Sequence, residues 1–332
     1  MFSPLMPWPL GSLTKGRGKW ISCVCVPTPM SSHSTTTSSL SGQPADGFQN
    51  PSAGVDQTPA EKTPVQKMES LHRWLHENSP VAVALSGGVD SALLTCIAFE
   101  VLGENAVAVT GISPSLSSQE LDSARQLTRQ VGIRHLELET HELSRAEYRE
   151  NSGDRCYHCK SELFDVILQA PALEGFTAVD GTQASDQLDD RPGAIAASER
   201  GVYSPLRDFG FNKELIRNLA RERNLASHDR PARPCLASRI PVGTRVDADL
   251  LRRIEVLESV LSGEGFSVYR ARCEEQRLVV EIAVEELESK SDCAWRNRLD
   301  AIARQQGFKE RLVDLRGYGG AGEPRLEPLV GN

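Results

Sequence analysis

No apolar run in this 332-residue sequence approaches the roughly 20 residues that a helix needs to cross a bilayer. There is also no internal repeat, and the net charge of −8 leaves no overall basic excess for general nucleic-acid binding. These absences exclude a helical membrane protein and disfavour an RNA- or DNA-binding one. The length instead predicts a soluble chain of about two domains, each with a real core.

The cysteines are too few, in too long a chain, to indicate a disulfide-stapled secreted domain. The eight positions are Cys23, Cys25, Cys96, Cys156, Cys159, Cys235, Cys273 and Cys293. Because a chain of this size has ample core without cross-links, we expect a reducing, cytoplasmic setting in which a few thiols carry out chemistry.

Residues 1–67 lack the hydrophobic pattern of a folded domain. Residues 31–41 read SSHSTTTSSLS, and no acidic residue precedes Asp46. A transit peptide is one interpretation, but arginine is scarce and no basic amphipathic helix is evident. We favour a disordered extension, or a start codon placed too early with Met68 as the true first residue.

From Met68 onward the hydrophobic pattern predicts alternating helices and strands. The strands are expected over residues 81–85, 106–111, 133–140 and 176–182, and the helices over 68–78, 91–103 and 117–132. This alternation indicates an α/β fold with a doubly wound, mostly parallel sheet over residues 68–240. The order helix, strand pair, helix and strand then predicts a small α+β domain over residues 241–332.

The first expected strand ends in SGGVDS, residues 86–91, and leads directly into a helix. Such a turn offers free backbone N–H groups at the positive end of a helix dipole, and its glycines let a phosphate approach the backbone closely. No Gly-Lys-Ser/Thr follows, and the G-x-G-x-x-G spacing of dinucleotide binders is absent. At the carboxyl end of a strand, the turn therefore predicts a phosphate site of another kind.

The SGGVDS turn resembles that of the PP-loop ATP pyrophosphatase superfamily, whose members transfer AMP from ATP to a substrate oxygen and release pyrophosphate. The resemblance implies that Ser86, Gly87, Gly88 and Ser91 hold the pyrophosphate part of ATP. It also implies that Asp90 lies near the associated Mg²⁺.

Three cysteines lie in unusually polar surroundings. The stretch DRCYHCK places Cys156 and Cys159 at C-x-x-C spacing, and Cys235 lies beside prolines and arginines in RPCLASRIPVGTRV. Three thiols can hold three irons of a [4Fe–4S] cluster and leave one iron open. They can also hold zinc with a fourth ligand such as His158, and the spacing alone leaves both interpretations open.

Seven motifs occur in the order seen in the LarE family and cover nearly everything from Met68 to about Gly320. They are SGGVDS, DRCYHCK, DGTQASDQLDDRPG, SPLRD, PCLASRIPVGTRV, VYRAR and VDLRGYG. The resemblance implies an ATP-dependent sulfur insertase of nickel-pincer nucleotide synthesis. Its substrate would be a small molecule, pyridinium-3,5-biscarboxylic acid mononucleotide: ATP adenylates a carboxylate, and sulfur displaces AMP to give a thiocarboxylate. LarE-like proteins also form homo-oligomers.

The family resemblance implies two possible sulfur routes. In one, the cysteine of the CLASR motif, here Cys235, gives up its own sulfur and becomes dehydroalanine. In the other, it joins a C-x-x-C pair to hold a [4Fe–4S] cluster that carries the sulfur. Because Cys156 and Cys159 are both present, we expect the cluster route. Cys273 stands where the family often has His and is not assigned to the cluster, and Cys96, on an apolar helix face, is expected in the core.

Two carboxylates follow the expected strand 176–182, where nucleotide or substrate would lie. Asp180 and Asp186 are both candidates, Asp180 for nucleotide binding, and the alternative for both is a solvated loop carboxylate. The family commonly has Asn where Gln183 stands, so we assign Gln183 no role. Arg191 belongs to the sequence RPG, which is a natural turn, so a structural role explains it.

Four arginines are candidates for binding the substrate or its phosphate. Arg239 and Arg245 flank the Cys235 motif and can hold phosphate or lower the pKa of the thiol. Arg270 and Arg272 alternate along an expected strand and so share one face, which suits an anionic nucleotide but also a solvated sheet surface.

Three other functions compete with the sulfur insertase. A tRNA thiolase of the same superfamily would need a basic tRNA-binding face, which the acidic balance disfavours. An ammonia-using amide synthetase would use the cysteines as structural zinc ligands. A nucleotide-binding regulator would bind ATP without releasing pyrophosphate.

Overall fold

The computed structural model describes residues 62–186, 192–231, 233–290, 294–319 and 323–330. In chain order, the main elements are α1 (Pro64–Glu77), β1 (Val81–Ala84), α2 (Val89–Leu102), β2 (Ala106–Ile112), α3 (Ser118–Val131), β3 (Arg134–Glu139), α4 (Ala146–Glu150), α5 (Arg155–Gln169), β4 (Thr177–Val179), α6 (Pro192–Glu199), α7 (Pro205–Asp208), α8 (Lys213–Glu222), α9 (Ala248–Gly263), β5 (Tyr269–Glu274), β6 (Arg277–Ile282), α10 (Val284–Ser289), α11 (Ala294–Gln305), β7 (Glu310–Asp314) and β8 (Leu326–Pro328). None of the helices within these ranges is long and apolar enough to cross a membrane.

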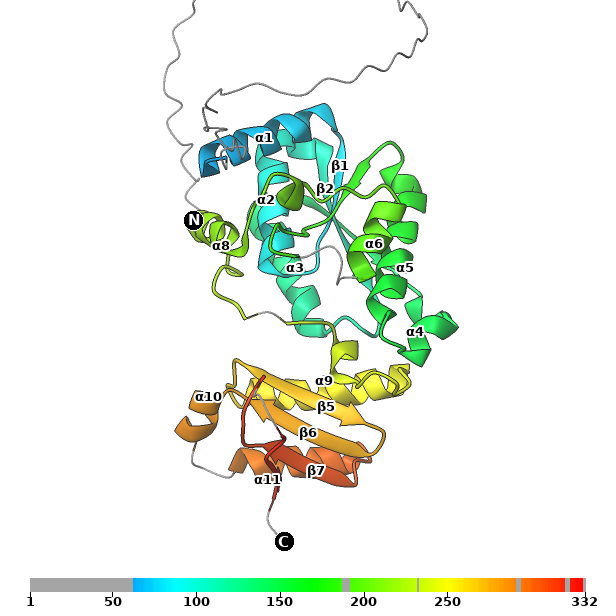
Figure 1. Cartoon of the computed structure of the whole chain (residues 1–332), viewed down its shortest axis with the longest axis vertical. Coiled ribbons are helices and arrows are strands. Elements are labelled where there is room, and N and C mark those ends of the chain that lie inside the picture. Colours follow the sequence, from blue (N-terminus) through cyan, green and yellow to red (C-terminus); the bar gives the residue numbers. More distant parts are fainter. Residues whose placement is uncertain (1–61, 187–191, 232, 291–293, 320–322, 331–332) are drawn as a thin grey trace, which may run out of the picture. The chain divides into compact units, whose positions relative to one another are not determined.

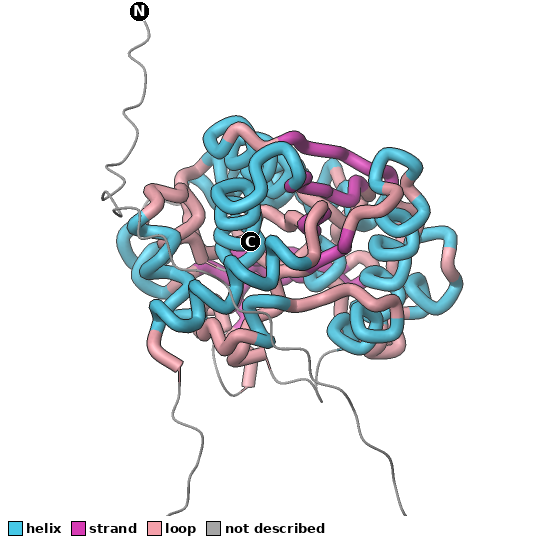
Figure 2. Tube along the Cα trace, turned by 90° about the horizontal axis from the view of Figure 1, so that it is seen from above, coloured by secondary structure: helices cyan, strands magenta, loops and turns pink. Residues whose placement is uncertain are grey.

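The first sheet has the strand order β3-β2-β1-β4, and every pairing in it is parallel. Strand β1 is buried throughout, and its alternate residues enter different cores: Val81 and Val83 pack on one side and Ala82 and Ala84 on the other. Helices α1, α2, α3 and α8 contribute to the first core, and α5 and α6 to the second (Figure 1). A view turned by 90° likewise shows helices on both sides of the strands (Figure 2).

This arrangement confirms the expected doubly wound α/β fold. A sheet covered on both faces needs strands that are apolar at successive positions, which explains why the runs at residues 81–85 and 106–111 read as continuous hydrophobic segments. Because all four strands are parallel, their carboxyl ends lie at one edge of the sheet, and the loops that follow them meet there.

Helix α1 begins at Pro64, before the expected start at Met68. The Thr63 hydroxyl accepts a hydrogen bond from the Gln66 N–H, and Gln66 Oε1 accepts one from the Thr63 N–H at 2.9 Å, so the two residues form a capping box. Residues 1–61, which include most of the predicted extension, lie outside the described residues.

The second sheet has the order β5-β6-β7-β8 and is mixed: β5–β6 and β7–β8 are antiparallel, and β6–β7 is parallel. Its core is formed with α9 and α11, and Leu236 and Ile240 from the segment before α9 join it. Both sheets belong to one compact unit, residues 59–332. The boundary near residue 240 stays a prediction.

Candidate active site

The SGGVDS turn joins the end of β1 to the first turn of α2. Gly87 has φ +82°, a conformation that side chains other than glycine rarely adopt, and a Cβ atom there would lie 2.9 Å from the Glu120 carbonyl oxygen. Ser91 Oγ accepts a hydrogen bond from the Ser86 N–H at 3.2 Å and donates to the Gly88 carbonyl at 3.2 Å. The turn is therefore held tightly, with Gly88 as the N-cap of α2.

Gly87→Ala is expected to cost about 1–3 kcal/mol in the free energy of unfolding and to weaken ATP binding about tenfold or more, because strain and the contact with Glu120 both push the turn out of shape. Denaturant unfolding and ATP titration measure the two effects. Gly103→Ala is the matched control, since Gly103 also has positive φ but its Cβ would meet nothing within 4 Å. Equal effects of the two substitutions would show that the close approach at Gly87 is unimportant.

Asp90 is paired with a lysine that the sequence did not single out. Lys213 Nζ lies 2.7 Å and 2.9 Å from the two Asp90 carboxylate oxygens, and Lys213 is the first residue of α8. The pair brings a cation and an anion, 123 residues apart in the chain, to the first turn of α2. Only the packing of α8 on α2 makes Lys213 part of this region.

Asp180 follows β4 and is buried beneath the turn that begins there. Its oxygens accept hydrogen bonds from Thr182 Oγ1 and Ser204 Oγ, both at 2.8 Å. A Cβ atom at the next residue, Gly181, would lie 2.7 Å from the Ser91 N–H nitrogen, so this turn packs directly on the start of α2. The geometry places Asp180 beside the SGGVDS turn, and its contact with nucleotide stays a prediction.

The neighbouring polar residues of this segment bond to one another. Gln183 Nε2 donates to Asp186 Oδ1 at 3.0 Å, and Gln183 is itself buried. Arg191 lies outside the described residues.

A cavity of about 250 Å³ opens at the carboxyl edge of the first sheet. Residues that follow β1, β2 and β3 line it, together with residues of α4, α5 and the Cys235 segment. The polar and ionisable members are Ser86, Thr110, Ser113, Ser115, Thr140, Glu142, Tyr148, Arg155, Cys156, Cys159, Lys160 and Cys235. One cavity thus contains the start of the glycine turn and all three of the cysteines that the sequence singled out.

Cys156 and Cys159 lie three residues apart in α5 and therefore on one face of that helix. Cys156 is exposed, Cys159 is partly buried, and Cys235 is exposed into the cavity; all three thiols are free. Across the described residues, no three His, Cys, Asp or Glu side chains are gathered closely enough to form a ready-made site for one metal ion. His158 does not line this cavity, and its Nε2 lies 3.1 Å from Asp154 Oδ2.

Desolvation raises the pKa of two of the cavity thiols. For Cys159, burial is the largest cause, and the negative charge of Glu142 adds to it. For Cys235, desolvation of the thiol by the protein atoms around it is the largest cause of the raised pKa, and the positive charge of Arg155 opposes this rise. Both thiols are therefore protonated at neutral pH when nothing is bound to them.

Alkylation of Cys235 with iodoacetamide should become about tenfold faster per pH unit between pH 7 and 9, because the thiolate reacts and its raised pKa keeps it a minor species over this range. Peptide mass spectrometry of the metal-free protein measures the rate. Cys96 is the control: it lies in the first core with its pKa raised to about 12 by burial, and it should stay unlabelled. A pH-independent rate at Cys235 would contradict the expected protonation.

The Cys235 segment reaches the cavity through contacts with the loop after β2 and with α3. The Leu236 N–H donates to the Ser115 carbonyl at 2.9 Å, and Arg230 forms an ion pair with the buried Glu120 at the start of α3. Glu120 is the residue against which Gly87 packs. The same helix start therefore contacts the glycine turn and anchors the segment that carries Cys235.

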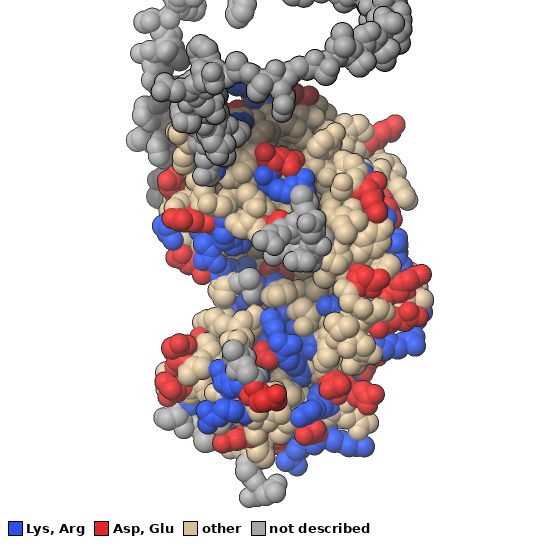
Figure 3. All heavy atoms as spheres, in the orientation of Figure 1, with Lys and Arg blue, Asp and Glu red and all other residues tan. Residues whose placement is uncertain are grey.

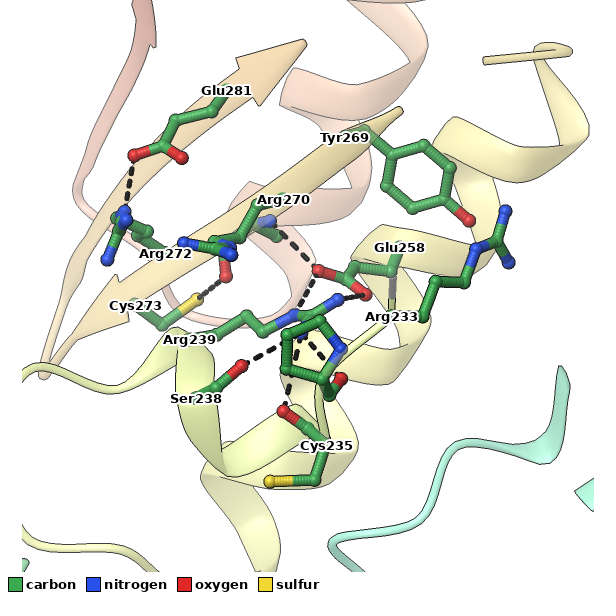
Figure 4. A network of polar contacts seen from close by, with 12 residues as sticks. Arg233, Cys235, Ser238, Arg239, Glu258, Tyr269, Arg270, Arg272, Cys273 and Glu281 are labelled. Atoms are coloured by element: carbon green, nitrogen blue, oxygen red, sulfur yellow. Dashed lines mark hydrogen bonds and ion pairs between the residues drawn. The ribbon is translucent and has the colours of Figure 1, made fainter. Parts of the chain in front are cut away.

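Arg239 is buried and connects the Cys235 segment to Glu258 of α9 (Figure 4). Its guanidinium donates to both Glu258 oxygens at 2.7 and 2.9 Å, to the Pro234 carbonyl at 2.7 Å and to Ser238 Oγ at 2.9 Å. Glu258, in α9, also accepts a hydrogen bond from the Ala271 N–H. These contacts join Cys235 to the second sheet, and binding of substrate phosphate by Arg239 stays a prediction.

None of the four predicted arginines, Arg239 included, lines the cysteine cavity. Arg245 is exposed. Arg270 and Arg272 share the partly exposed face of β5, as their alternation predicted; Arg270 donates to the Tyr318 hydroxyl at 2.8 Å, and Arg272 pairs with Glu281. Cys273 lies on the opposite, buried face of that strand with Tyr269 and Ala271 and is part of the second core. Substrate binding by these arginines stays a prediction.

The cations that do line the cavity are Arg155 and Lys160, which sequence analysis missed. Both belong to the DRCYHCK stretch, so their closeness to Cys156 and Cys159 was a signal that could have identified them. Glu142 and Tyr148 also line the cavity but come from the loop after β3 and from α4, and no sequence signal marked them.

Comparison with known proteins agrees with this geometry. Residues 68–151 match the asparagine synthase family model. An uncharacterized protein of Synechocystis sp. is 36% identical over 253 residues, which are 76% of this chain and 94% of that protein. The pyridinium-3,5-bisthiocarboxylic acid mononucleotide synthase of Lactiplantibacillus plantarum, a LarE protein, is 30% identical over 254 residues, 76% of this chain and 91% of that enzyme.

The chain belongs to the LarE family. A more distant relative is the glutamine-dependent NAD(+) synthetase of Aquifex aeolicus, 28% identical over 207 residues, which are 58% of this chain and only 36% of that enzyme. Membership of the LarE family, together with the asparagine synthase match to the glycine-turn region, supports an ATP-using enzyme.

Proposed function

We propose that this LarE-family protein adenylates a carboxylate of pyridinium-3,5-biscarboxylic acid mononucleotide with ATP and then replaces AMP with sulfur. The observation that carries the proposal is the shared cavity: Ser86 of the glycine turn and three free cysteines line the same space. A site that activates a carboxylate and a site that supplies sulfur must be adjacent, because a free acyl adenylate would be lost to water.

In the first step, a carboxylate oxygen of the substrate attacks the α-phosphorus of ATP, and the bond to the pyrophosphate oxygen breaks. The N–H groups of the turn at residues 86–91 and the start of α2 offset the charge on the departing pyrophosphate. We propose that Ser86, Gly87, Gly88 and Ser91 contact it and that Asp90 holds the associated Mg²⁺. Lys213, already bonded to Asp90, adds positive charge at the same place.

In the second step, a sulfide sulfur attacks the acyl carbon, the carbon–oxygen bond to AMP breaks, and a thiocarboxylate forms. Three free thiols, the donor set that a [4Fe–4S] cluster takes, line the cavity among mainly apolar atoms, but in the described structure they are not gathered closely enough to hold one metal ion. Cys156, Cys159 and Cys235 would hold three irons. When bound, the cluster would supply the sulfur through its fourth iron.

Anaerobic reconstitution with iron and sulfide tests this function. We expect about four irons per chain, and on addition of ATP, Mg²⁺ and the biscarboxylate mononucleotide, AMP and a thiocarboxylate detected by mass spectrometry. Cys159→Ala should lose the cluster, whereas Cys96→Ala, which removes a core thiol that does not line the cavity, should keep it. Dehydroalanine at Cys235 after one turnover would favour the sacrificial route instead.

The alternative functions make different predictions in the same assay. A tRNA thiolase would bind tRNA with a strong salt dependence, although acidic and basic side chains are interspersed over the face drawn in Figure 3. An ammonia-using synthetase would consume ammonia or glutamine with ATP. A regulator would bind ATP and release no pyrophosphate, so pyrophosphate release alone decides against it.

A further inference from the structure

A buried glutamate lines the cysteine cavity and has no role in the steps above. Glu142 follows β3 and is 1% exposed. Its Oε1 accepts a short hydrogen bond from Ser113 Oγ, while Oε2 is buried and has no hydrogen-bond partner among the residues that the structure describes. Buried carboxylate oxygens are almost always hydrogen-bonded or charge-paired in folded proteins, so this oxygen requires an explanation.

The polar neighbours of Glu142 in the cavity are already engaged elsewhere. The Tyr148 hydroxyl bonds to Ser115 Oγ at 2.6 Å. Arg155 donates to Asn151 Oδ1 at 2.6 Å, and Lys160 Nζ lies 5.3 Å from the centre of the Phe164 ring. Within the described structure, neither of the two cations that line the cavity, Arg155 and Lys160, contacts the Glu142 carboxylate directly. The negative charge of Glu142 is therefore not neutralised by a direct partner.

A ligand with a positive charge would complement this carboxylate. The substrate class of the proposed function has one, because the ring nitrogen of a pyridinium nucleotide carries a full positive charge and no ionisable proton. The ring faces are apolar, and the surface of the cavity is mainly apolar as well, with Leu116 and Leu163 among its lining residues. In such low-dielectric surroundings a carboxylate stabilises a ring cation much more strongly than it would in water.

We propose that Glu142 is a specificity-determining residue that selects a cationic pyridinium ring over a neutral one. This inference rests on the proposed function for its substrate class and adds the residue that recognises the charge of the ring. It assigns Glu142 to binding alone, with no proton transfer and no contact with ATP.

Equilibrium binding to the full-length protein without ATP, iron or sulfide tests the inference. The probes are nicotinic acid mononucleotide, a pyridinium monocarboxylate, and its dihydro form, which has a neutral ring. We expect the native protein to bind the pyridinium form at least about tenfold more tightly, and Glu142→Gln to lose most of that preference while it retains affinity for the dihydro form. Glu142→Asp should restore part of the preference, since it restores the charge.

Two controls separate this role from a structural one. Glu139→Gln removes an exposed carboxylate at the end of β3 and should leave both affinities unchanged. The affinity for ATP with Mg²⁺ should change less than twofold in Glu142→Gln. The inference is overturned if that variant weakens both probes equally or weakens ATP–Mg²⁺ binding. It is also overturned if the native protein fails to distinguish the probes or binds neither. This test measures binding alone, whereas the proposed function is tested by product formation. Failure of the inference and failure of the proposed function therefore appear in different measurements.

Discussion

Asp90→Ala is expected to abolish AMP formation, whereas Cys235→Ala should keep it and lose only the thiocarboxylate product. Asp90 lies in the first turn of α2 beside the glycine turn, and in the proposed function it holds the Mg²⁺ that offsets the charge of the departing pyrophosphate. Removing one group that stabilises such charge typically costs about 10²–10³-fold in rate. Cys235 lines the cavity and, in the proposed function, takes part only in sulfur transfer, so its loss should leave adenylation intact.

The two partial reactions can be followed separately. Pyrophosphate release reports adenylation, and mass spectrometry of the nucleotide product reports sulfur transfer. Asp249→Ala, which removes a largely exposed carboxylate from the first turn of α9, is the matched control for Asp90→Ala and should change neither reaction. Loss of sulfur transfer alone in both Asp90→Ala and Cys235→Ala would show that this division of labour is wrong.

Arg239→Ala is expected to destabilise the protein by about 3–5 kcal/mol, because it leaves Glu258 buried without its charged partner. The same change releases the Pro234 carbonyl and so loosens the segment that presents Cys235. Denaturant unfolding measures the first effect. Arg245→Ala, at the exposed arginine on the other side of the motif, should stay within about 0.5 kcal/mol of the native value.

A double substitution distinguishes a structural Arg239 from one that binds substrate. Replacing Arg239 and Glu258 together with apolar residues of similar volume should recover much of the lost stability, since neither charge is then buried alone. If Arg239→Ala instead unfolds with the native free energy but binds the mononucleotide weakly, its guanidinium serves the substrate phosphate, as its place in the sequence suggested.

The sequence by itself determined the fold class and the local geometry of the two strongest motifs. Continuous apolar runs at residues 81–85 and 106–111 indicate a sheet covered on both faces, and glycine at position 87 permits the left-handed conformation that the turn adopts there. The closeness of Cys156 to Cys159 also followed from their C-x-x-C spacing, and the structure places both in α5. These features depend on neighbours within a few residues, which is why they can be read locally.

Only the tertiary structure decided which charged groups meet. Arg239 looks like a ligand-binding residue in the chain but is bonded to Glu258, and Asp90 is paired with Lys213. Glu142 carries no motif at all, yet it lines the same cavity as Cys235. Arg239 and Glu258 are 19 residues apart and meet because the Cys235 segment packs on α9, whereas Asp90 and Lys213 are 123 residues apart and meet because α8 packs on α2. Glu142 and Cys235 meet at the edge of the sheet where the parallel strands end. Local sequence patterns carry no record of such long-range pairings.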